Sequence, residues 1–220
     1  MWYNLINRSI SVLLKSVNTP ILTMAKLELW MPFKTYSISQ KFGETANLAF
    51  YIANNIPITM HNGIDFVSPN SYVRASHDGT VVFAGEDGAG GLGVVIRTNE
   101  MFDYKDSQVY FKTIYWHLKT GTIQVRAGQQ VFVGDILAEQ DSTGLSTGNH
   151  LHYGLKPVVQ GEQDWIWFNL EQDNGVMGAV DPTPYFNNRW AGDAKIMLSM
   201  IANLQEQIKI LQQLIWIRKI

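Results

Sequence analysis

The sequence predicts a mainly β protein, an antiparallel β-sheet or sandwich-like domain, followed by a C-terminal α-helix. Two observations predict the sheet. Short runs of β-branched and aromatic residues alternate with Gly, Asn and Asp between about residues 35 and 155, and the 220 residues include 18 glycines. A third observation predicts the helix, because apolar residues recur every three or four positions after Gly192. The length suits one domain with appendages.

The predicted strands follow one another through the middle of the chain. Between them, the segment EDGAGG (residues 86–91) is a turn rich in residues that tolerate a positive φ. Residues 99–108 are polar enough for a surface loop, and no helical period of useful length interrupts the region. The strands are expected at Thr80–Gly85, Gly93–Arg97, Val109–Leu118, Asp135–Gln140 and His150–Leu155.

The two ends of the chain differ from this middle part. We expect residues 1–34 to be an N-terminal leader or extension, of which residues 1–23 are dispensable or follow from an upstream start. Residues 35–190 form the predicted domain, and its aromatic-rich loop at residues 157–180 favours a small satellite core over a ligand-facing wall. Residues 191–220 form a predicted amphipathic helix. Its apolar residues form just under three heptads, at Met197, Ile201, Leu204, Ile208, Leu211 and Ile215. We expect the helix equally to pack on its own domain or to self-associate.

The composition excludes several classes of protein and site. The formal net charge of −2 offers no basic surface for a nucleic-acid partner. The chain has no cysteine, so a metal would have to be held by His, Asp or Glu. No apolar run approaches the roughly 20 residues of a transmembrane segment. The N-terminal apolar run SVLL is shorter than the ~7 residues of a signal-peptide core, so no clear signal peptide is expected.

The histidines carry the strongest chemical signal. His150 and His152 stand two residues apart in a predicted strand, so their side chains should share one face. By the same rule Tyr115 and His117 should face together, with Trp116 facing away. Each pattern taken alone is better explained by a hydrogen-bonded structural histidine.

A second segment supplies a matching carboxylate. The bend in HNGIDF can bring His61 and Asp65 to one point, and imidazole and carboxylate groups suit Zn²⁺. A His-x-x-x-Asp pair alone is a weak signal. The conjunction of four histidines in three short segments favours a metal site, whereas His77, in SHDGT, lacks a partner and is expected at the surface.

Several motifs in order resemble the lysostaphin/LytM-type zinc metallopeptidases, over about residues 36–186. HNGIDF is similar to the family's His-x-Gly-x-Asp-Phe metal motif, and YWHL resembles its Tyr-x-His-Leu motif. The run from VRAGQQVFVGD through STGNHLHYGL is similar to the segment that ends in His-Leu-His, and VDPTPYF resembles its closing segment.

The resemblance implies the function and the site. It implies a zinc-dependent endopeptidase of the duplicated hybrid motif fold that hydrolyses peptide bonds in cell-wall peptidoglycan, in the stem or the cross-bridge. One Zn²⁺ would be held by His61, Asp65 and His152, while His117 and His150 would line the site, activating the attacking water and stabilising the oxyanion. Tyr115 and Asn149 are further candidates for substrate contacts.

Two other functions remain open at this point. One is a non-catalytic peptidoglycan-binding or activator module, and the other is a phage virion-associated or lysis protein, such as an endolysin, that uses the same domain. In each case the action is extracytoplasmic, at the cell wall, with the export route open. Departures from the family pattern, such as Asp141 and Gly154, touch no predicted ligand and concern the substrate groove.

Overall fold

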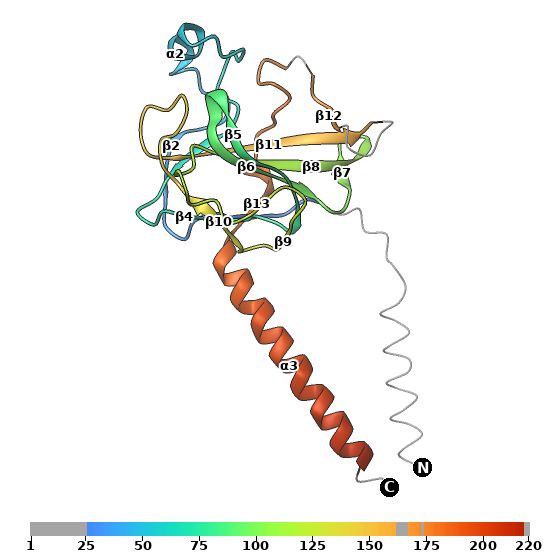
Figure 1. Ribbon diagram of the computed structural model, residues 1–220. Helices are drawn as coiled ribbons and strands as arrows, with labels where there is room; N and C mark the ends of the chain where they lie inside the picture. Colours follow the sequence, from blue (N-terminus) through green and yellow to red (C-terminus); the bar gives the residue numbers. More distant parts are fainter. Residues whose placement is uncertain (1–25, 162–166, 173, 218–220) are drawn as a thin grey trace.

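A computed structural model describes residues 26–161, 167–172 and 174–217 (Figure 1). Most of the expected residues 1–34, part of the loop at 157–180 and the last three residues lie outside this part. The predicted mainly β fold with a C-terminal helix is confirmed. Its strands and helices are β1 (Leu29–Met31), β2 (Ser37–Gln40), α2 (Leu48–Ala53), β3 (Ile64–Val67), β4 (Tyr72–Arg74), β5 (Gly79–Asp87), η1 (Gly88–Gly90), β6 (Gly91–Thr98), β7 (Phe102–Tyr104), β8 (Ser107–Trp116), β9 (Gln130–Val131), β10 (Ile136–Glu139), β11 (Leu151–Gln160), β12 (Trp167–Asn169), η2 (Thr183–Tyr185), β13 (Phe186–Trp190) and α3 (Ala191–Ile217).

One large antiparallel sheet carries the fold. Its strands lie in the order β2-β3-β11-β8-β6-β5-β9, and β12 and β7 pair at the side with β11 and β8. The long strand β11 lies between β3 and β8, with His152 opposite Asp65 on one side and opposite Trp116 on the other. This register brings segments that are almost ninety residues apart in sequence to one place on the sheet.

Alternation along the strands separates a core face from an open face. On β11 the odd-numbered residues Leu151, Tyr153 and Leu155 are fully buried, which agrees with the period of two expected of a strand. They pack with Phe66, Tyr115 and others beneath the sheet, where the small β4–β10 pair also lies. The even-numbered residues of β11 therefore face the opposite side, where the site forms.

The N-terminal part of the fold begins earlier than predicted. Leu27, Leu29, Met31 and Phe33 are all buried in the core, and β1 pairs with β13 in the one parallel pair found among the described residues. The expected boundary at residue 34 therefore falls several residues too late. Apolar alternation in LELWM marks β1, but a three-residue strand is short for a pattern-based prediction.

Three other local expectations were incomplete. Helix α2 lies within the region where no helix was expected; at six residues it is too short to show a period. Strand β7 occupies part of the predicted loop at 99–108 and pairs with β8. The aromatic-rich segment includes strand β12, which extends the sheet beside the end of β11.

The C-terminal helix projects away from the sheet, as Figure 1 shows in orange and red. Its first turn is anchored by the buried Ala191 and Ala194 and by an ion pair of Lys195 with Asp135. Its apolar side chains from Ile196 to Leu211 are 46–60% exposed. The expectation that the helix packs on its own domain is therefore wrong beyond the first turn. Among the described residues, no helix is long and apolar enough to cross a membrane.

Candidate metal centre

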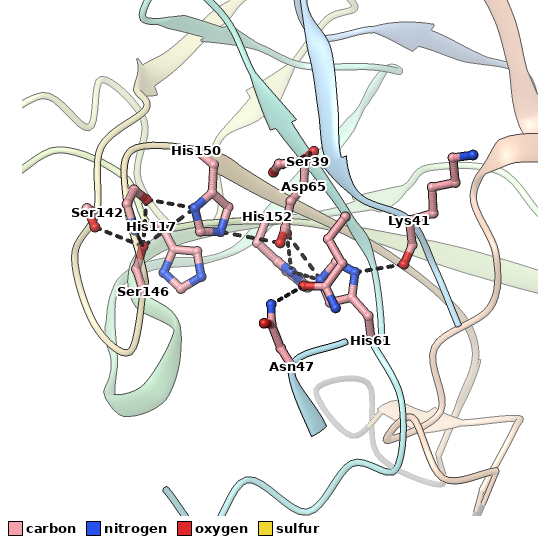
Figure 2. A network of polar contacts seen from close by, with 12 residues as sticks. Ser39, Lys41, Asn47, His61, Asp65, His117, Ser142, Ser146, His150 and His152 are labelled. Atoms are coloured by element: carbon pink, nitrogen blue, oxygen red, sulfur yellow. Dashed lines mark hydrogen bonds and ion pairs between the residues drawn. The ribbon is translucent and has the colours of Figure 1, made fainter. Parts of the chain in front are cut away.

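Two adjacent strands bring an aspartate and two histidines together. Asp65 lies in β3, His152 lies opposite it in β11, and His61 precedes β3 in the bend expected from the sequence. All three side chains are buried, and Figure 2 shows them pointing toward one another. The position of His152 follows from the strand register, whereas His61 reaches the same point because the chain turns at Asn62 and Gly63.

The donor atoms of these three residues share one small volume. Asp65 Oδ1 lies 3.1 Å from His61 Nε2 and 3.1 Å from His152 Nδ1. The two imidazole nitrogens are themselves 3.1 Å apart. Around a tetrahedral Zn²⁺ with ligands near 2.0–2.1 Å, donor atoms stand about 3.3 Å from one another. One ligand atom from each residue, all within 4.8 Å, therefore forms a set that suits such an ion.

The proton on His61 is fixed by its outer contact. His61 Nδ1 lies 3.0 Å from the Lys41 carbonyl oxygen, which can only accept a hydrogen bond. Nδ1 must therefore carry the proton, and the lone pair of Nε2 points toward Asp65 and His152. An outer carbonyl that orients a ligand histidine in this way is typical of metal sites.

The charge balance of the cluster also fits a cation. Burial by itself raises the pKa of Asp65, but the imidazoles of His152 and His61 beside the carboxylate lower it well below its usual range. Burial lowers the pKa of His152. An ionised carboxylate and an imidazole lone pair directed at the same point are therefore favoured near neutral pH. A bound cation would offset the electrostatic repulsion between them.

Gly63 leaves the space that the His152 ring occupies. A Cβ atom at residue 63 would stand 2.6 Å from the carbonyl oxygen of Tyr153 and 2.7 Å from the His152 ring. Real Cβ atoms essentially never approach so closely, so an alanine here would displace either the backbone of β11 or the imidazole. The glycine of HNGIDF is thus required by close packing between β3 and β11.

His150 stands beside the cluster with its proton also fixed. Its Nδ1 lies 2.7 Å from the Gly148 carbonyl oxygen and must donate to it. Its Nε2 lies 3.6 Å from Asp65 Oδ2. The expected convergence of His150 and His152 is present, although β11 begins only at Leu151.

His117 reaches the site by a different route from the one predicted. Its φ of +63° ends the alternation of β8, so the imidazole turns toward His150, with ring centroids 4.7 Å apart. His117 Nδ1 donates to the Thr143 carbonyl oxygen at 2.7 Å, which leaves Nε2 as an acceptor. Burial, together with His152, lowers the pKa of His117 to about 4. The ring is therefore neutral at pH 7.

The predictions for residues around His117 need correction. Tyr115 is fully buried on the core face, where its hydroxyl accepts a hydrogen bond from the Ser76 amide, so it cannot contact substrate. Trp116, expected to face away from the site, instead lines the cavity into which the metal centre opens. The side chains of Tyr115 and Trp116 alternate between the two faces of the sheet as in a regular strand. The alternation ends at His117, where the backbone leaves the β region.

Asn149 and His77 have different outcomes. Asn149 is exposed in the loop before β11, outside the cavity lining, and its contact with substrate stays a prediction. His77, expected at the surface, is buried: its Nδ1 donates to the Asp78 carbonyl oxygen, and its Nε2 lies 2.8 Å from Thr113 Oγ1. A turn-like sequence gave no signal of this contact with a distant strand.

The metal centre opens into a cavity of about 220 Å³. Its walls come from β2, α2, β8, β11 and the loop before β11. Sequence reasoning missed most of its lining, Trp116 and Gln40 among it. Trp116 packs so closely over Gly93 that a Cβ there would stand 1.5 Å from the indole, and Gln40 accepts hydrogen bonds from Asn47 and Tyr51 at its Oε1. His152 is directly opposite Trp116 in the β11–β8 pair, so the two side chains share one face of the sheet. Counting from His152 across this pair would have placed Trp116 correctly.

A buried His–Asp–His cluster with two further imidazoles, at the base of a cleft on a β-sheet, defines the class of metal-dependent hydrolases. Residues 59–164 match Peptidase family M23, and the chain carries a domain of this metallopeptidase family, as the resemblance to lysostaphin/LytM-type enzymes implied.

The chain is also similar to individual known proteins. The DD-carboxypeptidase/endopeptidase Mpg of Neisseria meningitidis serogroup B is 37% identical over 95 residues, which are 43% of this chain and 19% of that protein. The peptidoglycan DD-endopeptidase ShyA of Vibrio cholerae is 33% identical over 134 residues, 59% of this chain and 28% of that protein. The chain thus spans under a third of the length of these relatives. The crystallised catalytic domain of lysostaphin from Staphylococcus simulans overlaps 68% of this chain and 91% of its own, at 24% identity and a TM-score of 0.49.

Proposed function

We propose that this chain is a zinc-dependent endopeptidase that hydrolyses peptide bonds of bacterial cell-wall peptidoglycan. One observation carries the proposal: three buried donor atoms converge at the base of a cleft, and two further imidazoles stand beside them. The match to a metallopeptidase family and the activities for which the relatives are named support it.

The proposed ligands are His61, Asp65 and His152, which would hold one zinc ion. Zinc suits two nitrogen donors and one oxygen donor, and three protein ligands leave a position open for catalysis. When bound, the ion would polarise the substrate carbonyl and acidify water at neutral pH. The Lys41 carbonyl and Gly63 act on this set from outside, the first by fixing the His61 proton and the second by giving room to His152.

His117 is proposed as the proton acceptor. Its Nδ1 hydrogen is committed to Thr143, so only Nε2 can take a proton from the attacking water. The lowered pKa keeps the ring neutral, and therefore competent to accept, throughout the physiological range.

His150 is proposed as the hydrogen-bond donor. Since its Nδ1 hydrogen is committed to Gly148, its Nε2 can donate only when the ring carries a second proton. The Asp65 Oδ2 atom lies 3.6 Å from this Nε2. Such a ring would stabilise negative charge on the substrate oxygen and protonate the leaving amine.

The substrate sets the place of action. Peptidoglycan lies outside the cytoplasmic membrane, so the protein acts there, either after export or as part of a virion or lysis system. A non-catalytic binding module is the alternative, but the complete His–Asp–His set disfavours it.

Self-association through α3 is part of the proposal. Its exposed seam has Ile201 and Ile208 at a positions and Met197, Leu204 and Leu211 at d positions, a pattern that favours parallel two-stranded coiled coils. We expect sedimentation equilibrium to show a dimer, and the double substitution Ile201→Asp with Leu204→Asp to yield a monomer. A wild-type chain that stays monomeric at about 100 µM would contradict this part.

The enzymatic proposal is tested with purified cell-wall sacculi. The protein is stripped of metal with a chelator, divided, and assayed for released muropeptides by chromatography with and without one equivalent of Zn²⁺. Release only in the zinc-restored sample is expected. Sacculi that remain intact in both samples would refute the endopeptidase function and favour the binding module.

A further inference from the structure

Three cationic side chains lie in a row across the face of the sheet that bears the metal centre. Lys156 on β11 is opposite Lys112 on β8, and Lys112 is opposite Arg97 on β6. Residues 152, 154 and 156 of β11 share one face, so Lys156 lies on the same side of the sheet as His152. The three strands lie side by side in Figure 1.

This row has no ion-pair partner among the described residues. Like charges directly opposite each other in a sheet are destabilising. Burial and Lys112 lower the pKa of Lys156, and burial and Arg97 lower the pKa of Lys112. The fold therefore keeps three half-buried cations together at a cost in stability.

Arg97 is fixed in position by aromatic contacts. Its guanidinium carbon lies 4.3 Å from the ring centroid of Trp167 and 5.2 Å from that of Tyr110. Its Nε is buried without a hydrogen-bond partner among the described residues. Arg97 is thus oriented by stacking, and one of its donors has no acceptor within that part of the protein.

The row begins inside the cavity of the metal centre. Lys156 lines that cavity, and the other two cations continue the row away from it across β8 and β6. Lys156 lies four positions along β11 from His152, a distance of about 13 Å. Apart from Asp65, the cavity has one acidic lining residue, Asp87, whose charge raises the pKa of Lys156 against the larger lowering by burial and Lys112, without an ion pair between the two side chains. An extended peptide whose scissile bond lies at the metal centre would reach Lys156 within about two to four residues.

We propose that Lys156, Lys112 and Arg97 form a carboxylate-binding site that selects substrate peptides with a free carboxylate two to four residues from the scissile bond. The inference rests on the proposed endopeptidase function and narrows its substrate. In a D-Ala–diaminopimelate cross-link the donor stem's diaminopimelate, two residues from the scissile bond, carries such a carboxylate, whereas bridges built only of glycine have none within reach. The row therefore favours the D-Ala–diaminopimelate type of cross-link.

A matched pair of synthetic substrates tests this site. Both are the same cross-linked stem peptide, one with the free carboxylate of the donor-stem diaminopimelate and the other with that group as a carboxamide. A charge-assisted hydrogen bond contributes about 1.5–3 kcal/mol, and each 1.4 kcal/mol is about tenfold. The zinc-loaded wild type should therefore have a kcat/KM at least about tenfold higher for the carboxylate peptide.

Variants locate the effect. The double variant K112Q/K156Q should lose this preference through a raised KM for the carboxylate peptide, with an unchanged kcat. Arg126→Gln removes one positive charge at an exposed position outside the cavity, as Lys156→Gln does within it, and should keep the preference. Circular dichroism melting shows that each variant is folded, and Lys156→Gln alone serves if the double variant is not.

Two results would overturn the proposal: equal kcat/KM of the wild type for both peptides, or an undiminished preference in K112Q/K156Q. Failure of the proposed function looks different, because the wild type would then cleave neither peptide. In that case calorimetric binding of the two peptides to wild type and K112Q/K156Q decides the question. Selective binding of the carboxylate form by the wild type alone supports the site, and equal binding rejects it.

Discussion

Replacing Gly63 by alanine should damage the metal centre without touching a ligand. The added Cβ would stand 2.6 Å from the Tyr153 carbonyl oxygen and 2.7 Å from the His152 ring, well inside the 3.4 Å at which ordinary contact begins. The carbonyl belongs to β11, an interior strand of the sheet, and cannot yield easily, so the imidazole must move by several tenths of an ångström or more. Overpacking of this kind costs about 1–3 kcal/mol of folding stability.

The metal affinity should fall along with the stability. Loss of an outer contact that orients a metal ligand commonly weakens binding about 10–100-fold, and the displaced ring here is itself a proposed ligand. The assay is a Zn²⁺ titration against a competing chelator, with a parallel urea unfolding curve for the metal-free protein. Gly63→Ala should show both the weaker binding and the lower unfolding free energy.

Gly148→Ala is the matched control. It lies next to the site, no atom stands within 4 Å of its built Cβ, and its φ is outside the left-handed region. It should bind zinc like the wild type. Wild-type affinity in Gly63→Ala, or an equal loss in Gly148→Ala, would refute the packing argument.

The remaining predictions concern the cavity wall and a buried histidine. Gly93→Ala places a Cβ 1.5 Å from the Trp116 indole. Displacement of the ring should reduce kcat/KM for a cross-linked peptide, while the zinc affinity stays at the wild-type value. Unchanged kinetics would contradict the proposal that Trp116 forms a wall of the substrate cavity. Burial lowers the pKa of His77 below 6.5. Below pH 6.5 the unfolded chain therefore binds a proton at His77 more readily than the folded protein does, and folding stability falls as the pH falls. Urea unfolding between pH 7.5 and 5.5 should show a shallower pH dependence for His77→Gln than for the wild type, by up to about 1.4 kcal/mol per pH unit. Identical slopes would show that His77 does not couple to folding.

The sequence predicts those parts of the site that depend on regular alternation. His150 and His152 share a face because a strand has a period of two, and the bend at HNGIDF brings His61 to Asp65 as expected. Tyr115 and Trp116 obey the same period, but their faces were assigned by counting from His117. That residue has a positive φ, which a pattern of residue types does not reveal.

Other features depended on contacts between distant segments. The buried place of His77 comes from Thr113 on another strand, and the entry of β1 into the fold comes from pairing with β13 at the far end of the chain. The cation row was hidden for the same reason. Arg97, Lys112 and Lys156 are far apart in sequence, and only the registers of β6, β8 and β11 bring them together.

The central claim is that His152 holds the metal while His150 acts beside it on the reacting groups. Zinc content and muropeptide release, measured together on the wild type, His152→Ala and His150→Ala, test it most directly. The wild type should bind one zinc ion and digest sacculi, and His152→Ala should lose both properties. His150→Ala should retain zinc while turnover falls at least about 100-fold. A wild type without stoichiometric zinc, or a His152→Ala variant that digests sacculi as well as the wild type, would contradict the account.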